Sequence, residues 1–309
     1  MSALNVLTGG AVTAGLDAAA LGIEFAPLPE GEYPVGAEDD PDTLPAQIVN
    51  IEEPIDISTT PVTNAQYAAG LAQLEGRDTV LMAQLPGDQL RVIARGRSAE
   101  INSMSSSDIR RAVEDSVTLA GLRGIEGGLK AFNLDAIVQQ VVDVGPVTLA
   151  HRLNQMREVF RGPNKPVVLV SFWEAAAFAA LFGLRLPTEV EWEAAARGKK
   201  GHEYGTSTGE LYDANGKKLA HFHKRSTADV KSYPPSELGF YDMAGNVWEW
   251  TQSLYRRGGS IRVLRSGSWS NVFLEFLRAA YRNDGSPDIR FDYYGFRVAR
   301  VPRGSKKPV

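Results

Sequence analysis

The segment that most tightly constrains the fold is KPVVLVSFWEAAAFAALFGLRLPTEVEWEAAARG, residues 165–198, because it contains the start and stop signals of two successive short helices. Ser171 predicts the N-cap of the first helix, and Gly183 predicts its C-terminal end. Thr188 lies in the N-cap region of a second helix, whose acidic first turn complements the helix dipole. The apolar residues 167–170 predict a short buried strand. The segment therefore predicts a strand and two capped helices in close succession.

The flanking sequence has two other patterns. Residues 31–67 contain short apolar clusters separated by Pro, Gly and Asp, which predict short strands and turns, and Thr63-Asn64 predicts the cap of a helix that follows. Residues 77–161 are predicted to be mostly helical. Apolar stripes with helical spacing recur there in three stretches, residues 106–122, 134–142 and 147–160. These stretches predict a helical insertion.

The composition excludes several classes of protein. The 309-residue chain is 43% hydrophobic and 23% charged, which is typical of a globular protein, and its net charge of −4 provides no overall basic field for nucleic acid. No run of about eighteen or more apolar residues is present, so no membrane span is predicted. The start of the chain lacks the basic region of a signal peptide. Two locations are expected, the cytoplasm or display on a phage or cell surface through a partner.

The inventory of catalytic side chains is small. Cysteine is absent, which excludes intrachain disulfides, thiolate metal ligands and thiol catalysis. The sequence has no GxSxG elbow, P-loop or HExxH motif. Two interpretations are open for His221 and His223: half of a metal site on one face of a strand, for which no third ligand is evident, or two surface histidines on a loop, which is the commoner outcome of such a pattern. We therefore expect no catalytic residues.

The stretch NVWEW places two indoles on one face of an extended segment. Trp248 and Trp250 alternate with Glu249, which then points to the other side. A buried, unpaired carboxylate costs several kcal/mol, so Glu249 needs a cationic partner, and Arg297 and Arg265 are the candidates. A catalytic role for Glu249 is the alternative. We favour the structural role because acidic residues fixed between aromatic rings usually form internal pairs.

Five phrases occur in a characteristic order, PVTNAQY (61–67), the helical segment 165–198, GFYDMAGNVWEWTQS (239–253), VLRSGSW (263–269) and YYGFRVAR (293–300). In this order they resemble the formylglycine-generating-enzyme-like, or sulfatase-modifying-factor, branch of the C-type lectin fold. The resemblance covers about residues 25–70 and 163–302. It implies one α+β lectin-fold domain over residues 1–309, with a small twisted antiparallel sheet, two flanking helices, much ordered loop and a helical insertion at 77–161.

The same resemblance bears on catalysis and on metals. It implies that the enzymatic members use either a cysteine pair that holds copper or an iron site of three histidines, and this sequence supplies neither. We therefore expect no enzymatic activity and no required cofactor.

The resemblance also implies a structural calcium site on the loop before NVWEW. Its ligands would be the Asp242 carboxylate and the carbonyls of Met243, Gly245 and Val247, although Asp242 could equally cap a turn there.

The C-terminal segment resembles a second group on this scaffold, the bacterial or phage variable proteins of diversity-generating retroelements. The arrangement RSGSW…RAAYRN…SPDIR…GFR, residues 265–297, looks like their variable region, in which adenines of Asn codons are rewritten. Such changes cannot produce Lys, Gln, Glu, Met or Trp, and residues 270–294 contain only Glu275 from this set. The framework residues would be Trp248, Glu249, Trp250, Arg265, Gly267, Trp269, Gly295, Phe296 and Arg297. The ligand-binding variable residues would be Ser270, Asn271, Phe273, Leu274, Phe276, Tyr281, Asn283, Asp284, Gly285, Ser286, Ile289, Phe291, Asp292, Tyr293 and Tyr294.

This resemblance implies a non-enzymatic protein that displays a diversified C-terminal surface to varied ligands, chiefly proteins. Tyr and Phe supply contact area at low entropic cost, and Ser, Asn, Asp and Gly supply adaptable polar contacts. We therefore expect the aromatic residues 291, 293 and 294 to point outward; the alternative is that Phe273, Phe276 and Phe291 seal the core. Two other functions stay open. One is a metal-dependent oxygenase-like enzyme of the formylglycine-generating-enzyme superfamily, and the other is a structural assembly component docked through the insertion.

Overall fold

The computed structural model describes residues 16–38, 41–73, 156–257 and 259–300 in full, together with the backbone of three strands between residues 79 and 143. The helices lie at η1 Ala19–Leu21, α1 Asn64–Ala72, η3 Glu158–Phe160, α6 Phe172–Leu181, α7 Glu189–Arg197 and η4 Leu274–Leu277. The strands of the main part are β1 Phe25–Leu28, β2 Gly31–Val35, β3 Gln47–Ile51, β4 Ile55–Ser58, β8 Trp248–Leu254, β9 Arg262–Arg265, β10 Asn283–Gly285, β11 Tyr294–Phe296 and β12 Ala299–Arg300.

Three α-helices begin where the sequence predicts. Thr63, Ser171 and Thr188 cap α1, α6 and α7, and each hydroxyl accepts a hydrogen bond from the backbone N–H three residues later. The side chain at that third position, Gln or Glu, returns a bond to the cap residue's own N–H, which completes a capping box. Gly183 follows α6 with a φ of +67°, as a C-terminal glycine should. These local signals therefore place the helices without tertiary information.

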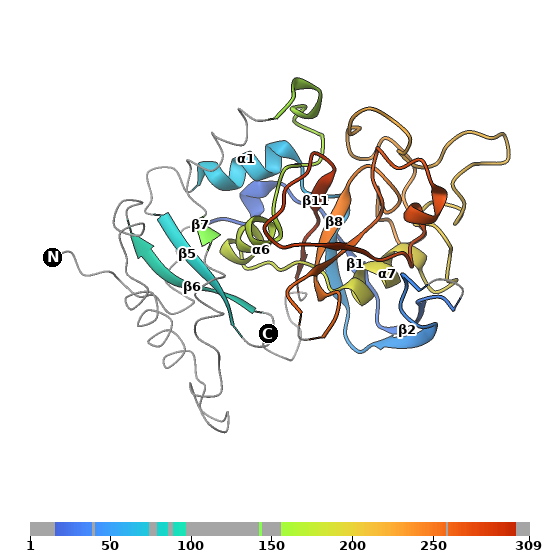
Figure 1. Ribbon diagram of the computed structural model, residues 1–309, viewed down its shortest axis with the longest axis horizontal. Coiled ribbons are helices and arrows are strands. Elements are labelled where there is room, and N and C mark those ends of the chain that lie inside the picture. Colours follow the sequence, from blue (N-terminus) through green and yellow to red (C-terminus); the bar gives the residue numbers. More distant parts are fainter. Residues whose placement is uncertain are drawn as a thin grey trace.

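Small sheets connect distant parts of the chain. The largest described sheet has the order β10-β9-β8-β11, in which β8, β9 and β10 are antiparallel neighbours and β11 runs parallel to β8. A second sheet, β1-β4-β12, joins the N-terminal strands to the end of the described chain, and β2 pairs with β3. Figure 1 shows α6 and α7 beside the β8 sheet, with irregular loops filling the remaining volume. The expected α+β class with flanking helices and extensive ordered loop is confirmed.

The helix α6 lies at the centre of the main hydrophobic core. All of its residues except Ala180 are buried, and it packs with Trp248, Trp250 and Phe296 of the β8 sheet. On the other side Tyr67 of α1 stacks on Phe178, with ring centroids 4.8 Å apart. A second core forms around Trp192 of α7. The four-stranded sheet is thus held between two helices that are themselves fixed by caps.

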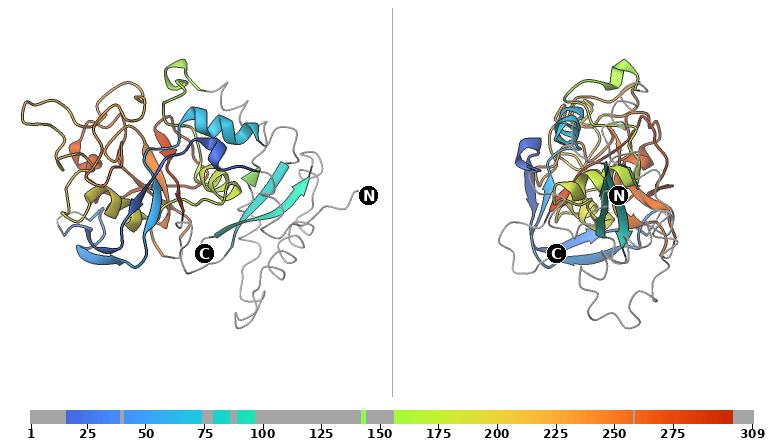
Figure 2. Two further views of the ribbon diagram at one scale, coloured as in Figure 1. Left: turned by 180° about the vertical axis from the view of Figure 1, so that it is seen from behind. Right: turned by 90° about the vertical axis from the view of Figure 1, so that its left-hand side faces the viewer.

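The segment at 77–161 differs from the helical expectation in its described parts. β5 Thr79–Leu85 and β6 Gln89–Gly96 form an antiparallel hairpin, and β5 also pairs with β7 Val142–Asp143. The hairpin lies at the α6 end of the molecule, away from α7 and β2 (Figures 1 and 2). A Pro-Gly-Asp sequence between two apolar runs is a turn signal that the helical interpretation overlooked. The three predicted amphipathic helices lie mainly outside the described residues.

One predicted strand is also absent. Residues 167–170 form no strand, because Leu169 has a φ of +58° and turns the chain. Backbone bonds still fix this segment: the N–H of Val167 donates to the carbonyl of Val62, and that of Leu169 donates to the carbonyl of Phe291. The apolar run is therefore buried as an irregular connection between α1 and the C-terminal loops.

Candidate binding face

The carboxylate of Glu249 forms a fully buried ion pair with Arg297. The guanidinium donates from Nε to Oε2 at 2.6 Å and from Nη2 to Oε1 at 2.8 Å, and neither side chain is exposed. Trp192 Nε1 donates to the same Oε2 at 2.7 Å. Arg297 also donates to the carbonyls of Ser58 and Tyr241. The prediction that Arg297 pairs with Glu249 is confirmed, and the pair joins β8, β4 and α7 at one point.

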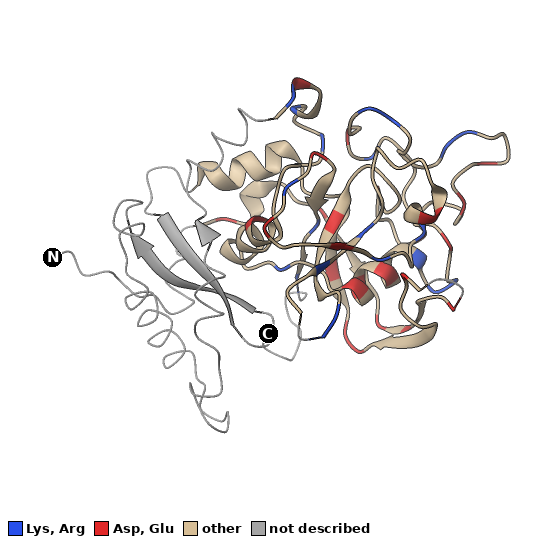
Figure 3. Cartoon of the chain, viewed as in Figure 1, with Lys and Arg blue, Asp and Glu red and all other residues tan. Residues whose placement is uncertain are grey.

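The other candidate partner, Arg265, belongs to a second buried network. Its Nη2 lies 2.8 Å from Glu193 and 3.5 Å from Glu189 of α7, and its Nη1 donates to the carbonyl of Ala279 at 2.8 Å. Arg282 Nε donates to Glu189 at 2.6 Å. In Figure 3 the acidic residues of α7 appear as several red segments of its ribbon, close to the red segment on β8. These contacts anchor the beginning and middle of the C-terminal segment 265–297 to α7. The acidic first turn of α7 thus does more than complement the helix dipole, and this anchoring role was not predicted from the sequence.

The loop after β9 is closely packed at its base. Gly267 has a φ of +74°, and a Cβ there would lie 2.6 Å from Leu277 Cδ2 and 2.8 Å from the Phe276 carbonyl. Asn271 Oδ1 accepts from Ser268 N at 2.7 Å and from Ser268 Oγ at 2.9 Å. Trp269 Nε1 donates to the carbonyl of Asp292 at 3.1 Å, which links the first and last thirds of the segment. The base of the loop after β9 is therefore held by close contacts and hydrogen bonds, while side chains farther along the loop are open to solvent.

Two series of aromatic contacts run from the core to the surface. In the first, Trp248 lies 6.1 Å from Tyr281, Tyr281 lies 5.1 Å from Phe276, and Phe276 lies 6.1 Å from Phe273 between ring centroids. Phe273 is 61% exposed. The series connects a buried tryptophan of β8 to an exposed ring.

The second series begins at the other tryptophan of β8. Trp250 lies 5.2 Å from Tyr294, whose ring meets Phe291 edge to face at 5.1 Å. Phe291 stacks on Tyr293 with centroids 5.0 Å apart and an interplanar angle of 4°. Phe291 is 40% exposed and Tyr293 is half-buried. Both series therefore start from one face of β8, which carries both Trp248 and Trp250 as predicted. Both series end at rings that are exposed to solvent.

Most of the predicted variable residues reach the surface, but two do not. Those exposed are Ser270, Phe273, Leu274, Asp284 and Phe291. Those half-buried are Asn271, Phe276, Tyr281, Asn283, Ser286, Ile289, Asp292 and Tyr293. Gly285 and Tyr294 are buried, so outward display is wrong for these two. Val272, which is 53% exposed in the middle of the loop, was missed, although Val is among the residues that an altered Asn codon can encode.

The physical reasons for the two buried residues are clear. Tyr294 pairs with Trp248 in the parallel β8–β11 ladder, and its burial raises the pKa of its hydroxyl. A Cβ at Gly285 would lie 2.7 Å from Trp250 Cη2 and 2.9 Å from Leu264 Cδ1. Period-two alternation along residues 291–294 could not reveal a pairing with a strand that lies more than forty positions earlier.

His221 and His223 do not form half of a metal site. His221 is half-buried; its Nε2 lies 2.9 Å from the carbonyl of Ser226 and its Nδ1 lies 3.5 Å from the Tyr233 hydroxyl. Burial lowers the pKa of His221. His223 is exposed and has a φ of +52°, so the two imidazoles do not share a strand face. Among the described residues no group of three or more His, Cys, Asp or Glu side chains could hold a metal ion.

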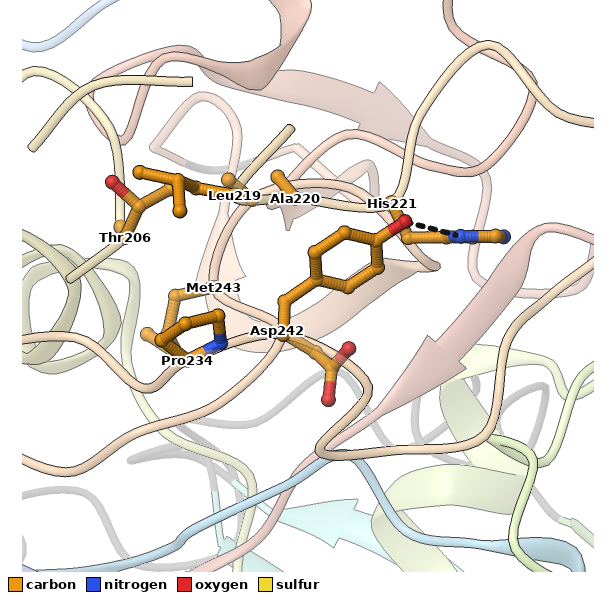
Figure 4. A pocket seen from close by; sticks show the side chains of 10 residues that line it. Thr206, Leu219, Ala220, His221, Pro234, Asp242 and Met243 are labelled. Carbon is orange, nitrogen blue, oxygen red and sulfur yellow. Dashed lines mark hydrogen bonds between the residues drawn. The ribbon is translucent and has the colours of Figure 1, made fainter. Parts of the chain in front are cut away.

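A small pocket lies between the His221 segment and the loop before β8. His221, Asp242 and Met243 (labelled in Figure 4) are among its lining residues, as is Tyr233, and its volume of about 10 Å³ is enough for one water-sized particle. Asp242 Oδ1 accepts from Asn246 Nδ2 at 3.1 Å, and Oδ2 accepts from the N–H of Lys231 at 3.1 Å. Burial raises the pKa of Asp242 to about 6. Within the part of the chain that the structure describes, no cationic side chain pairs with Asp242 at 4 Å or less.

A match to a family model identifies the family. The sequence matches the sulfatase-modifying factor enzyme 1-like domain over residues 18–302, and the chain belongs to this family, whose fold is C-type lectin-like. No described helix has the length and apolar character needed to cross a membrane.

Three curated relatives match about the same share of the chain. The serine/threonine-protein kinase Pkn1 of Chlamydia trachomatis is 41% identical over 153 residues, 44% of this chain and 24% of that protein. The inactive C-alpha-formylglycine-generating enzyme 2 of Mus musculus is 40% identical over 151 residues, 43% of this chain and 48% of that protein. The formylglycine-generating enzyme of Streptomyces coelicolor is 36% identical over 169 residues, 44% of this chain and 53% of that protein. The chain thus spans about a quarter to a half of these relatives' length.

Two solved structures share the fold. PvdO from Pseudomonas aeruginosa superposes with a TM-score of 0.56 at 21% identity and covers 98% of this chain and 100% of its own. Variable protein 1 of Treponema denticola superposes with a TM-score of 0.53 at 19% identity and covers 90% of this chain and 95% of its own. The fold is thus shared by proteins with different names, and the curated sequence relatives include one named as an enzyme and one named as inactive.

Proposed function

We propose that this protein is a non-enzymatic ligand-binding protein whose C-terminal segment, residues 265–297, displays diversified side chains to varied protein ligands. The observation that carries the proposal is the contrast between a buried, ion-paired framework and an exposed apolar face. Arg265, Glu249 and Arg297 have no exposed surface, whereas Val272, Phe273 and Phe291 are 53%, 61% and 40% exposed. Contiguous exposed apolar patches on soluble proteins mark binding sites, and the exposed residues Val272, Phe273 and Leu274 are adjacent in the chain.

The side chains on this face suit protein recognition. Phe273, Phe276, Phe291 and Tyr293 offer rigid apolar anchors, because an aromatic side chain freezes only two χ angles on binding. A few such anchors at the centre of about 800 Å² are enough for a specific complex. The proposed variable positions are those predicted variable residues that are exposed or half-buried in the structure, together with Val272. The buried residues Gly285 and Tyr294 are assigned to the framework instead. The fold likeness to a protein called variable protein 1 is consistent with this proposal.

Two observations support a binding role over catalysis. The chain contains no cysteine, whereas formylglycine-generating members of the family that it resembles use a cysteine pair. Glu249, the candidate acid in the framework, has one oxygen that accepts from Arg297 and a second that accepts from both Arg297 and Trp192. A carboxylate held in this way stabilises the fold and has no access to a substrate.

The coding DNA tests this proposal. A diversified segment requires a near-copy of the sequence encoding residues 265–297 that differs at adenines, together with a reverse-transcriptase gene close by. We expect both, with the adenine differences falling in codons of exposed or half-buried residues such as Ser270, Phe273 and Phe291. The absence of both elements would contradict the retroelement assignment.

We also propose that the Asp242 loop holds a structural calcium ion. The donors are of the oxygen type that a hard cation prefers: the carboxylate of Asp242 has no ion-pair partner among the described residues, and the carbonyls of Met243, Gly245 and Val247 follow it within five residues, that of Gly245 accepting from Ser266 Oγ at 3.0 Å. A bound calcium ion would supply charge compensation there. Titration of the chelator-treated protein with CaCl₂ in a calorimeter should give one site that Asp242→Ala removes; heat of binding that survives this substitution would contradict the assignment.

A further inference from the structure

A basic segment lies directly beside the proposed variable loop. The N–H of His223 donates to the carbonyl of Asn271 at 3.0 Å, and the N–H of Lys224 donates to the carbonyl of Trp269 at 2.7 Å. His223, Lys224 and Arg225 are all exposed. These backbone bonds fix the segment, which we call the basic rim (residues 223–225), along the first part of the loop that carries Val272, Phe273 and Leu274.

The positive charge of the basic rim is not neutralised within the described residues. Neither Lys224 nor Arg225 has a carboxylate within ion-pair distance there. Burial and, second to it, the charge of Lys224 lower the pKa of Lys218, whose ammonium lies 4.0 Å from the centre of the Phe222 ring. The Lys218 ammonium also donates to the carbonyl of Phe222 at 3.0 Å, so a second ammonium group lies beside the basic rim of a chain whose net charge is −4.

The arginines of the variable segment itself are already engaged. Arg278, Arg282 and Arg290 pair with Glu203, Glu189 and Glu174 at 3.2, 2.6 and 2.7 Å. Their positive charges hold the framework together and are not available in full to a ligand. Rewriting the adenines of Asn codons also cannot produce lysine. A lysine at the edge of this face therefore has to come from a constant segment, and Lys224 lies at such a position.

We propose that the basic rim is a constant part of the binding face, and that its ligands are proteins with carboxylate side chains next to an apolar anchor. The inference rests on the proposed function and adds a shared chemical requirement to it. The variable loop selects among partners through its apolar and polar side chains. The rim attracts acidic surfaces in general, raises the rate of encounter and disfavours basic partners.

Selection of peptides tests the rim and the variable face separately. A random-peptide phage library is selected on the full chain, and the enriched peptides are synthesised and measured by fluorescence anisotropy. Four proteins are compared: the wild type, the rim variant K224E/R225E, the face variant F273S/F291S and the control R256E/R257E. The control reverses two exposed arginines in the turn between β8 and β9, at the opposite end of that strand pair from Arg265. Equal urea unfolding curves establish that each variant folds.

We expect the enriched peptides to contain Asp or Glu beside Phe, Leu or Trp. Their Kd should rise about tenfold or more in K224E/R225E, change less than about twofold in R256E/R257E, and depend on ionic strength only where the rim is intact. Unchanged affinity in K224E/R225E together with a loss of affinity in F273S/F291S would contradict the role of the basic rim and leave the proposed function standing. Failure to select peptides, or peptides indifferent to F273S/F291S, would overturn the proposed function as well. Binding of a fluorescent single-stranded oligonucleotide that K224E/R225E abolishes and acidic peptides do not displace would assign the rim to nucleic acid instead.

Discussion

At the scale of single residues, the Glu249–Arg297 pair is the contact on which the framework most depends. Both side chains are fully buried, so removal of one partner leaves a charge without compensation. We expect Arg297→Met to lower the free energy of unfolding by about 3–5 kcal/mol. The measurement is urea denaturation followed by tryptophan fluorescence.

The double variant Glu249→Leu/Arg297→Met is the control for this prediction. It removes both charges, and replacement of a whole buried pair by apolar side chains is often nearly neutral. It should therefore be more stable than Arg297→Met alone. If the two variants are equally unstable, the loss comes from the shape of the guanidinium and its bonds to Ser58 and Tyr241 and not from an uncompensated carboxylate.

Gly267 provides a second prediction at this scale. It shares a φ near +75° with Gly216, but a Cβ at Gly267 would meet Leu277 and Phe276 within 3 Å, whereas a Cβ at Gly216 would meet nothing within 4 Å. Gly216→Ala should lower the free energy of unfolding by only about 1 kcal/mol, the cost of placing an L-residue in the left-handed backbone conformation. Gly267→Ala should cost about 1–3 kcal/mol more because the loop base has to move. Equal thermal unfolding midpoints for the two variants would show that the loop base is not rigid.

At the scale of elements, α7 acts as the support of the C-terminal segment. Glu193 is fully buried and bonds Arg265 of β9 at 2.8 Å, Arg197 at 3.0 Å and the N–H of Gly36 at 2.6 Å. Glu193→Gln keeps the shape but removes the charge between two guanidinium groups. We expect a loss of about 3–5 kcal/mol in unfolding free energy and faster trypsin cleavage at Arg278 and Arg282.

Glu191→Gln is the matched control for that prediction. Glu191 lies on the same helix, completes its capping box and pairs with Arg185, whose side chain is about a quarter exposed. A glutamine can still accept the capping bond, so the loss should stay below about 1 kcal/mol. Equal effects of the two substitutions would mean that α7 does not anchor the C-terminal segment through Glu193.

Elements with local signals could be predicted from the sequence, whereas elements defined by distant contacts could not. The caps at Thr63, Ser171 and Thr188 predict the helices because each box closes within three residues. The pairing of Glu249 with Arg297 was predicted as one of two options from the cost of burying a charge. The hairpin at 79–96 and the burial of Tyr294 were not predicted. The hairpin was missed because the helical periodicity of the neighbouring residues favoured a helical prediction over its turn signal. The burial of Tyr294 was missed because it depends on pairing with the distant residue Trp248.

At the scale of the whole molecule, the protein divides into a framework that tolerates little change and a face that tolerates much. Trp248 and Trp250 lie in the core, each at the inner end of one aromatic series. The outer residues Phe273 and Phe291 reach solvent. A scaffold that accepts many ligand-binding sequences requires this division, because substitutions at exposed sites seldom change stability by more than about 0.5 kcal/mol. The bound ligand would then differ between versions of the protein while the fold stays the same.

The unfolding free energy of a face variant, compared with that of a framework variant, tests this division most directly. The variant F273S/L274S/F291S replaces three exposed side chains at once, and Tyr294→Ser replaces one buried ring in the same segment. We predict that the triple variant stays within about 1 kcal/mol of the wild type in urea denaturation. Tyr294→Ser should lose about 3–5 kcal/mol. A loss of several kcal/mol in the triple variant would show that these side chains seal the core, and would contradict the account of an interchangeable binding face.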